Sequence, residues 1–129
     1  MCKRRCDKFC PNLIFSDSVT VGTIDATPSL LIDVPDVGYF NCRKFCLGVI
    51  QSIPDTATVN MPVYITIDGD ATVGFPLVDC NGLQLVASQI ENRYKYKVQV
   101  FRNLTTGVFK VYNLPNCYRQ TVLTAINET

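Results

Sequence analysis

The chain has 129 residues, of which 47% are hydrophobic and 18% are charged, and its formal net charge is +1. This composition suits one folded domain with a proper core and excludes a disordered, highly charged chain. No apolar run approaches the ~18–20 residues of a membrane span, and the first ten residues lack the apolar stretch of a signal peptide. We therefore expect a protein without a membrane span, made in the cytoplasm, that stays there or leaves by lysis or within a particle.

Residues 1–11 are interpreted as an N-terminal arm. Three cysteines stand at four-residue intervals, and the first ten residues carry four basic side chains against one acidic one. Such an arm reaches roughly 33 Å when extended, which is enough to cross onto a neighbouring copy. We expect it to be the element that contacts another subunit. The residues on which this expectation rests are Cys2, Lys3, Arg4, Arg5, Cys6, Lys8 and Cys10.

Residues 12–129 are interpreted as one β-domain. Short runs rich in β-branched and aromatic residues alternate with turns that contain Gly, Pro or Asn, a spacing typical of an all-β fold. The expected strands are 13–21, 29–34, the end of 39–53, 59–68, 71–79, 83–90, 93–101 and 107–114. Residues 40–47 are a short helix candidate, and residues 121–129 are either an edge strand or a short helix. The pattern predicts an antiparallel β-sandwich or jelly roll of about eight strands.

Residues 93–101 show the clearest period of two in the chain. One face carries Arg93, Lys95, Lys97 and Gln99, whereas the other carries Tyr94, Tyr96, Val98 and Val100. This alternation indicates a strand with one buried face and one solvated face. Because the tyrosines and the lysines point to opposite sides, the strand itself does not form a platform for stacking nucleic-acid bases. We expect no specific nucleic-acid partner.

Charge is distributed unevenly along the chain. Residues 11–79 contain eight acidic and two basic residues, whereas residues 80–129 contain six basic and two acidic residues. Such asymmetry suits association in which one region of a copy faces a different region of its neighbour, although small domains also scatter charge by chance.

The residue types needed for common chemistry are missing. The chain has no histidine, so imidazole bases and Cys₂His₂ zinc sites are excluded. Asp68-Gly69-Asp70 lacks the further ligands of a calcium loop and is interpreted as a hairpin turn. We expect no catalytic residue, no cofactor, no metal site and no small-molecule substrate.

The seven cysteines leave several possibilities open, and their odd number means that not all can pair within one chain. The arm thiols could oxidise to partners in the β-domain of a neighbour, or two of them could join Cys42 and Cys46 at a zinc ion. The internal cysteines could equally be small buried hydrophobic residues. The candidate thiol partners are Cys42, Cys46, Cys80 and Cys117.

The segment FNCRKFCLGVIQSIPDTATVNMPVYITI (40–67) resembles a set of small uncharacterised proteins from Firmicutes and their phages. The matching residues are Asn41, Cys42, Cys46, Ile53, Pro54, Asp55, Val59, Asn60, Pro62, Val63 and Thr66. The later segments FPLVDCNG (75–82) and TTGVFKVYN (105–113) are also similar to that set, although this chain has fewer cysteines near its C-terminus. The resemblance implies a virion component, such as a capsid decoration (cement) protein.

A second resemblance concerns architecture alone. Endospore appendage subunits are small jelly-roll domains with a cysteine-bearing N-terminal arm that bonds to neighbouring subunits, and the plan of this chain is similar. The leading hypothesis is a structural protein of a virion surface, with copies of itself and a major capsid protein as partners. The alternatives are an extracellular fibre subunit cross-linked through the arm cysteines and a carbohydrate- or surface-binding module.

Overall fold

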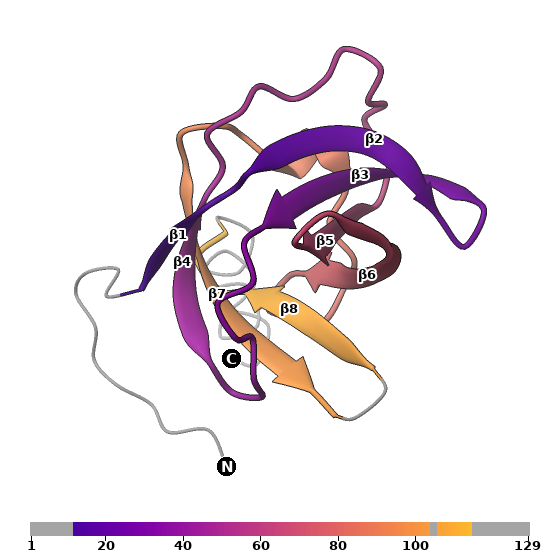
Figure 1. Ribbon diagram of the computed structural model, residues 1–129. Coiled ribbons are helices and arrows are strands. Elements are labelled where there is room, and N and C mark those ends of the chain that lie inside the picture. Colours follow the sequence, from indigo (N-terminus) through magenta and orange to yellow (C-terminus); the bar gives the residue numbers. More distant parts are fainter. Residues whose placement is uncertain (1–11, 104–105, 115–129) are drawn as a thin grey trace, which may run out of the picture.

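The computed structural model describes residues 12–103 and 106–114 (Figure 1). The arm residues 1–11, Cys117 and the C-terminal segment 121–129 lie outside these ranges, so the expectations about them are not addressed by the structure. The strands are β1 (Leu13–Phe15), β2 (Ser18–Ile24), β3 (Thr27–Val34), β4 (Lys44–Gly48), β5 (Val63–Ile67), β6 (Asp70–Val78), β7 (Lys95–Arg102) and β8 (Gly107–Val111). One 3₁₀ turn, Ala87–Gln89, completes the regular elements of the described residues.

The eight strands form one mixed sheet in the order β1-β4-β7-β8-β6-β5-β3-β2. This confirms the predicted all-β class and the expected number of strands. The sheet is not wholly antiparallel, however, because β1 pairs with β4, β3 with β5 and β6 with β8 in parallel. Parallel neighbours need long connections, so these three pairs join segments that lie far apart in the sequence.

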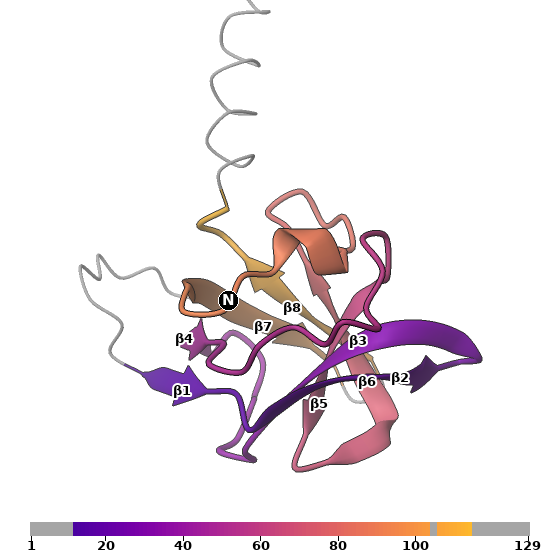
Figure 2. The ribbon, with the colours of Figure 1, turned by 90° about the horizontal axis from the view of Figure 1, so that it is seen from above.

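The sheet curls because β1 and β2, which follow each other in the sequence, form its two ends. Only Ser16 and Asp17 separate β1 from β2, yet these strands stand at opposite ends of the strand order. The Ser16 N–H donates to the Gly48 carbonyl at 2.9 Å, and the next N–H, that of Asp17, donates to the Asp33 carbonyl at 2.7 Å. The chain therefore changes partner from β4 to β3 within one residue, which brings the two ends of the sheet together (Figure 2).

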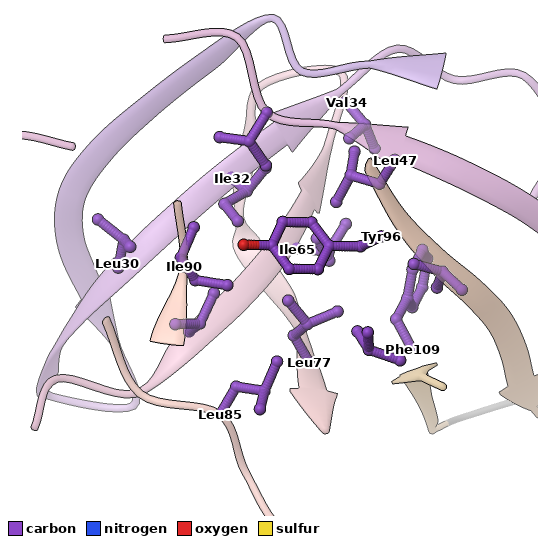
Figure 3. Close-up of a cluster of buried hydrophobic side chains, with 14 of the residues drawn as sticks. Leu30, Ile32, Val34, Leu47, Ile65, Leu77, Leu85, Ile90, Tyr96 and Phe109 are labelled. Carbon is purple, nitrogen blue, oxygen red and sulfur yellow. The ribbon is translucent and has the colours of Figure 1, made fainter. Parts of the chain in front are cut away.

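The alternation predicted for residues 93–101 is confirmed only from Lys95 to Val98, because Gln99, expected on the solvated face, is buried and Tyr94, expected on the buried face, is exposed. Tyr96, Val98 and Val100 are buried, whereas Lys95 and Lys97 are exposed. Figure 3 shows the Tyr96 ring among aliphatic side chains from the surrounding strands, including Leu77 and Ile65. Its hydroxyl accepts a hydrogen bond from the Glu91 N–H at 2.7 Å, so the phenol is both buried and satisfied. Burial raises the pKa of Tyr96 above its ordinary value.

Two sequence-based expectations differ from the structure. Residues 83–90 do not form a ladder, because only the bridges Val78↔Gln84 and Pro62↔Val86 are made before the chain turns at Ala87–Gln89. The carboxylate of Asp79 accepts the N–H groups of Asn81 and Leu83, which holds the preceding turn. Beyond that turn the Leu85 N–H donates to the Leu77 carbonyl and the Ala87 N–H to the Met61 carbonyl, so no single neighbouring strand pairs with the segment along its length. The helix candidate at 40–47 is instead a turn followed by strand β4.

Candidate functional site

A groove opens between two hairpin ends on one side of the molecule. Its walls are residues 73–76 of β6 and residues 101–103 and 106–108 of the β7–β8 hairpin, and its volume is about 670 Å³. We call this part the apolar half, since Val73, Phe75 and Phe101 line it. Figure 1 shows the β5–β6 turn, the end of β7 and the start of β8 on the same side of the domain.

The groove exists because β6 and β8 separate. Among the described residues, these strands pair only at Leu77↔Phe109 and Val78↔Lys110. The residue before this short ladder is Pro76, which has no N–H and so cannot donate to a neighbouring strand. Toward the β5–β6 turn, β6 therefore borders the groove with an edge that β8 does not cover, and such an edge can accept an added strand.

A second cavity of about 420 Å³ continues the groove toward the β5–β6 turn. It shares Val73, Phe75 and Arg102 with the apolar half and adds the carboxylates of Asp36, Asp68 and Asp70. We call this part the acidic half. Its three aspartates and one arginine give it a net charge of −2, because no other charged residue among those that the structure describes lines it.

The local sequence explains where the Asp68 and Asp70 carboxylates stand. Asp68 and Gly69 have φ of 55° and 78°, a combination that fits a tight hairpin turn, and Ile67 pairs with Asp70 across it. This confirms the hairpin predicted at Asp68-Gly69-Asp70. The turn is fixed from β3, since the Asp33 carboxylate accepts the Gly69 N–H at 2.7 Å and the Thr66 hydroxyl at 2.8 Å.

Two hydrogen bonds from Thr72 hold the Asp70 carboxylate. The Thr72 hydroxyl donates to it, and the Thr72 N–H donates to it at 3.0 Å. These two hydrogen bonds, the side-chain bond first, lower the pKa of Asp70.

Tyr39 forms the buried wall behind the carboxylates. Its ring packs against Phe45 and Phe109 with centroids 5.4 and 5.5 Å away, and its hydroxyl donates to the Pro35 carbonyl at 2.6 Å. Burial raises the pKa of Tyr39 to about 12; Arg43 opposes the rise, whereas Asp36 adds to it. A phenol with so high a pKa cannot act as an acid or base near neutral pH.

The arrangement offers features that suit binding. It offers an apolar floor, an uncovered strand edge and a cluster of carboxylates, which together match an extended segment carrying cationic and apolar side chains. Within residues 12–103 and 106–114, no group of three or more Cys, Asp or Glu side chains is arranged to hold a metal ion. The zinc alternative needs the thiolates of Cys42 and Cys46, and the structure contradicts it because both cysteines are disulfide-bonded.

A second polar surface lies on the outer side of β4, β7 and β8. Cross-strand pairing places Lys44 opposite Gln99, Lys97 opposite Cys46, Lys95 opposite Gly48 and Lys110 opposite Gln99. None of these partners is acidic. We call this surface, with Lys44, Lys95, Lys97 and Lys110, the lysine face.

The structure brings aromatic side chains to the lysine face that the sequence analysis missed. The Lys110 ammonium lies 5.4 Å from the Phe101 ring centroid and 6.0 Å from that of Tyr112. Phe101 is four residues beyond Lys97 on the same strand, so the period of two that places Lys97 on this face also places Phe101 there. Tyr112 follows β8 on its outer side, two residues beyond Lys110, so the same period applied to that strand would have found it. Phe101 also lines the apolar half of the groove, so the two surfaces adjoin there.

The predicted thiol partners Cys42, Cys46 and Cys80 are all disulfide-bonded in the structure. Cys46 is buried on β4 beside the start of β1, where its N–H donates to the Asn12 carbonyl at 2.9 Å. Cys42 has φ of 74° in the turn before β4, and Cys80 begins the turn after β6. Because three is an odd number, at least one of these disulfides joins a cysteine outside the described residues.

Comparisons with protein-family models, with curated proteins and with solved structures give no match for this chain. In the part of the chain that the structure covers, no helix is long and apolar enough to cross a membrane. The groove and the lysine face are therefore interpreted from their own geometry and charge.

Proposed function

We propose that this chain is a structural subunit that assembles with copies of itself on the surface of a virion, as a capsid decoration (cement) protein or a related surface component. The observation that carries the proposal is the pair of unlike surfaces on one small domain: an acidic groove with an uncovered strand edge, and an adjoining lysine face. Unlike surfaces favour heterologous contacts, in which one face of a copy meets a different face of the next.

Two further observations support an assembly role. Large apolar side chains stand exposed around the domain, among them Phe40 at 64%, Val59 at 66% and Leu83 at 65%. Repeated weak contacts add up when each copy binds several neighbours, so no single contact needs to be strong. The resemblance to small phage proteins points in the same direction.

The partners in this proposal are other copies of the chain and a major capsid protein. The lysine face provides the surface for an acidic partner such as a capsid lattice, since four ammonium groups meet no carboxylate across the strands. In this view the protein has no catalytic role, and its binding free energy comes from apolar area and charge complementarity.

The disulfides favour a second candidate, a self-assembling extracellular fibre subunit. Three bonded cysteines in the described residues show that this fold accommodates oxidised thiols, and extracellular assemblies exploit such bonds. The two candidates differ in the covalent state of the assembly. A fibre locked by intersubunit disulfides gives a ladder on non-reducing gels, whereas a decoration protein gives one monomer band.

Sedimentation of the purified chain over a range of protein concentrations and salt tests the proposal. We expect association at low ionic strength that weakens as salt rises, because the Debye length falls from about 10 Å at 0.1 M to about 3 Å at 1 M. A chain that stays monomeric at every concentration and salt, and that does not bind capsids, contradicts both candidates.

A further inference from the structure

We propose that the groove formed by the apolar half and the acidic half receives the N-terminal segment, residues 1–10, of a second copy of this chain. The inference rests on the proposed function as an assembly subunit and names its contact. The occupant is identified by chemistry: the groove is acidic at one end and apolar at the other, and residues 1–10 are basic with an apolar residue near their end.

The shape of the groove suits an extended segment of a partner chain better than a flat partner surface. Strand β6 spans Asp70–Val78, but among the described residues its ladder with β8 covers only Leu77 and Val78. The uncovered stretch runs for about 20 Å at the ~3.3 Å rise of a strand, and ten extended residues span up to about 33 Å. An added strand there would find backbone partners along β6.

Charge selects the orientation of the segment. Lys3, Arg4 and Arg5 match the carboxylates of the acidic half, where Asp68 is exposed at the turn. Placed this way, Phe9 lies toward the apolar half. The opposite orientation would bring the basic triplet beside Lys110, which stands over Phe101 at the far end of the groove.

The position of β1 favours a neighbour's segment over the chain's own. In Figure 1, β1 begins on the left of the domain, whereas the β5–β6 turn lies on the right, and Figure 2 separates them in the same way. The chain thus enters β1 on the side away from the β5–β6 turn, whose Asp68 and Asp70 line the acidic half. Donation to the next copy lets every subunit both give a segment and receive one.

Two matched variants of the full chain test the contact. The groove variant carries Asp68→Asn and Asp70→Asn; asparagine tolerates the left-handed backbone at 68 and keeps an acceptor for Thr72 at 70. The arm variant carries Lys3→Gln, Arg4→Gln and Arg5→Gln. Asp25→Asn is the control, since Asp25 is also exposed with φ of 50° but does not line the groove.

Sedimentation velocity at low ionic strength, after alkylation of accessible thiols, gives the readout. We expect each variant alone to self-associate about tenfold more weakly than wild type, and Asp25→Asn to match wild type. An equimolar mixture of the two variants should form a one-to-one complex that does not grow further. In that mixture the wild-type arm of the groove variant binds the wild-type groove of the arm variant, and the complex then offers no second pair of wild-type arm and wild-type groove.

A peptide with the sequence of residues 1–10, its three cysteines changed to serine, provides a second measurement. It should bind the arm variant and should inhibit wild-type association, whereas the same peptide with its four basic residues changed to glutamine should do neither. If wild type associates but the groove variant associates equally well, the groove contact is wrong and the assembly function stands. If wild type does not associate at all, both the groove contact and the assembly function are contradicted.

Discussion

The guanidinium carbon of Arg102 lies 5.2 Å from the centre of the Phe75 ring, and its Nη1 donates to the Tyr39 carbonyl at 3.1 Å. Phe75 in turn packs on the buried Phe109, with centroids 5.7 Å apart. Arg102 thus joins the surface of the groove to the aromatic core, and among the described residues it is the one cation that lines both halves of the groove.

Replacing Arg102 by methionine should separate these two roles. Loss of the hydrogen bond and of the cation–π contact should lower the free energy of unfolding by about 1–2 kcal/mol. Removing the only cation of the acidic half should also tighten binding of the residue 1–10 peptide several-fold. Urea unfolding and a peptide titration measure the two effects, with the exposed Lys95→Met as control. Weaker peptide binding by a folded Arg102→Met chain would contradict the groove assignment.

Alkaline pH should destabilise the fold through Tyr39. Its pKa is about 12 in the folded chain and about 10 when unfolded, so between these values the unfolded chain has lost a proton that the folded chain keeps. The stabilisation is complete below about pH 10 and is lost as pH rises through 12. Unfolding followed at several pH values should show this fall.

The variant Tyr39→Phe isolates that contribution. It loses the hydrogen bond to Pro35, so we expect lower stability at neutral pH but a shallower decline above pH 10. Tyr96, whose pKa is also raised by burial, should account for part of the decline that is left. An unchanged slope in Tyr39→Phe would show that this phenol does not titrate as described.

Reduction should destabilise the domain. A native disulfide contributes about 2–4 kcal/mol, and Cys42, Cys46 and Cys80 are all bonded, so a reductant should lower the melting temperature by several degrees or more. Because their bonds consume at least four of the seven cysteines, the denatured, unreduced chain should expose at most three thiols. Counting seven thiols before reduction would contradict the bonded state.

The lysine face should matter for binding and little for folding. Lys95 and Lys97 are exposed, so Lys95→Gln with Lys97→Gln should change the free energy of unfolding by no more than about 0.5 kcal/mol. Attachment to an acidic lattice should weaken and lose part of its salt dependence. Attachment to purified capsids at two salt concentrations measures this. Unchanged attachment would mean that the lysine face is only a solvated surface.

The sequence alone determined the fold class and the strands whose pattern is local. Residues 95–98 alternate between water and core as the sequence predicts, because successive side chains of a strand point to opposite faces. The turns at Gly69 and Gly82 were predictable for a similar reason, since φ of 78° and 84° suits glycine. The expected strand at 83–90 did not form, because its backbone bonds first to Leu77 and then to Met61 before the 3₁₀ turn, and no single neighbour continues a ladder.

Only the tertiary structure decided the groove and the lysine face. Asp36 and Asp68 belong to different loops, and they line one cavity because β3 pairs in parallel with β5, a contact that no local pattern specifies. Phe101 and Tyr112 join Lys110 on one face because β7 and β8 pair in a particular register. Register depends on which side chains are buried together across the whole sheet, so the position of a surface site is a property of the folded chain rather than of any one segment.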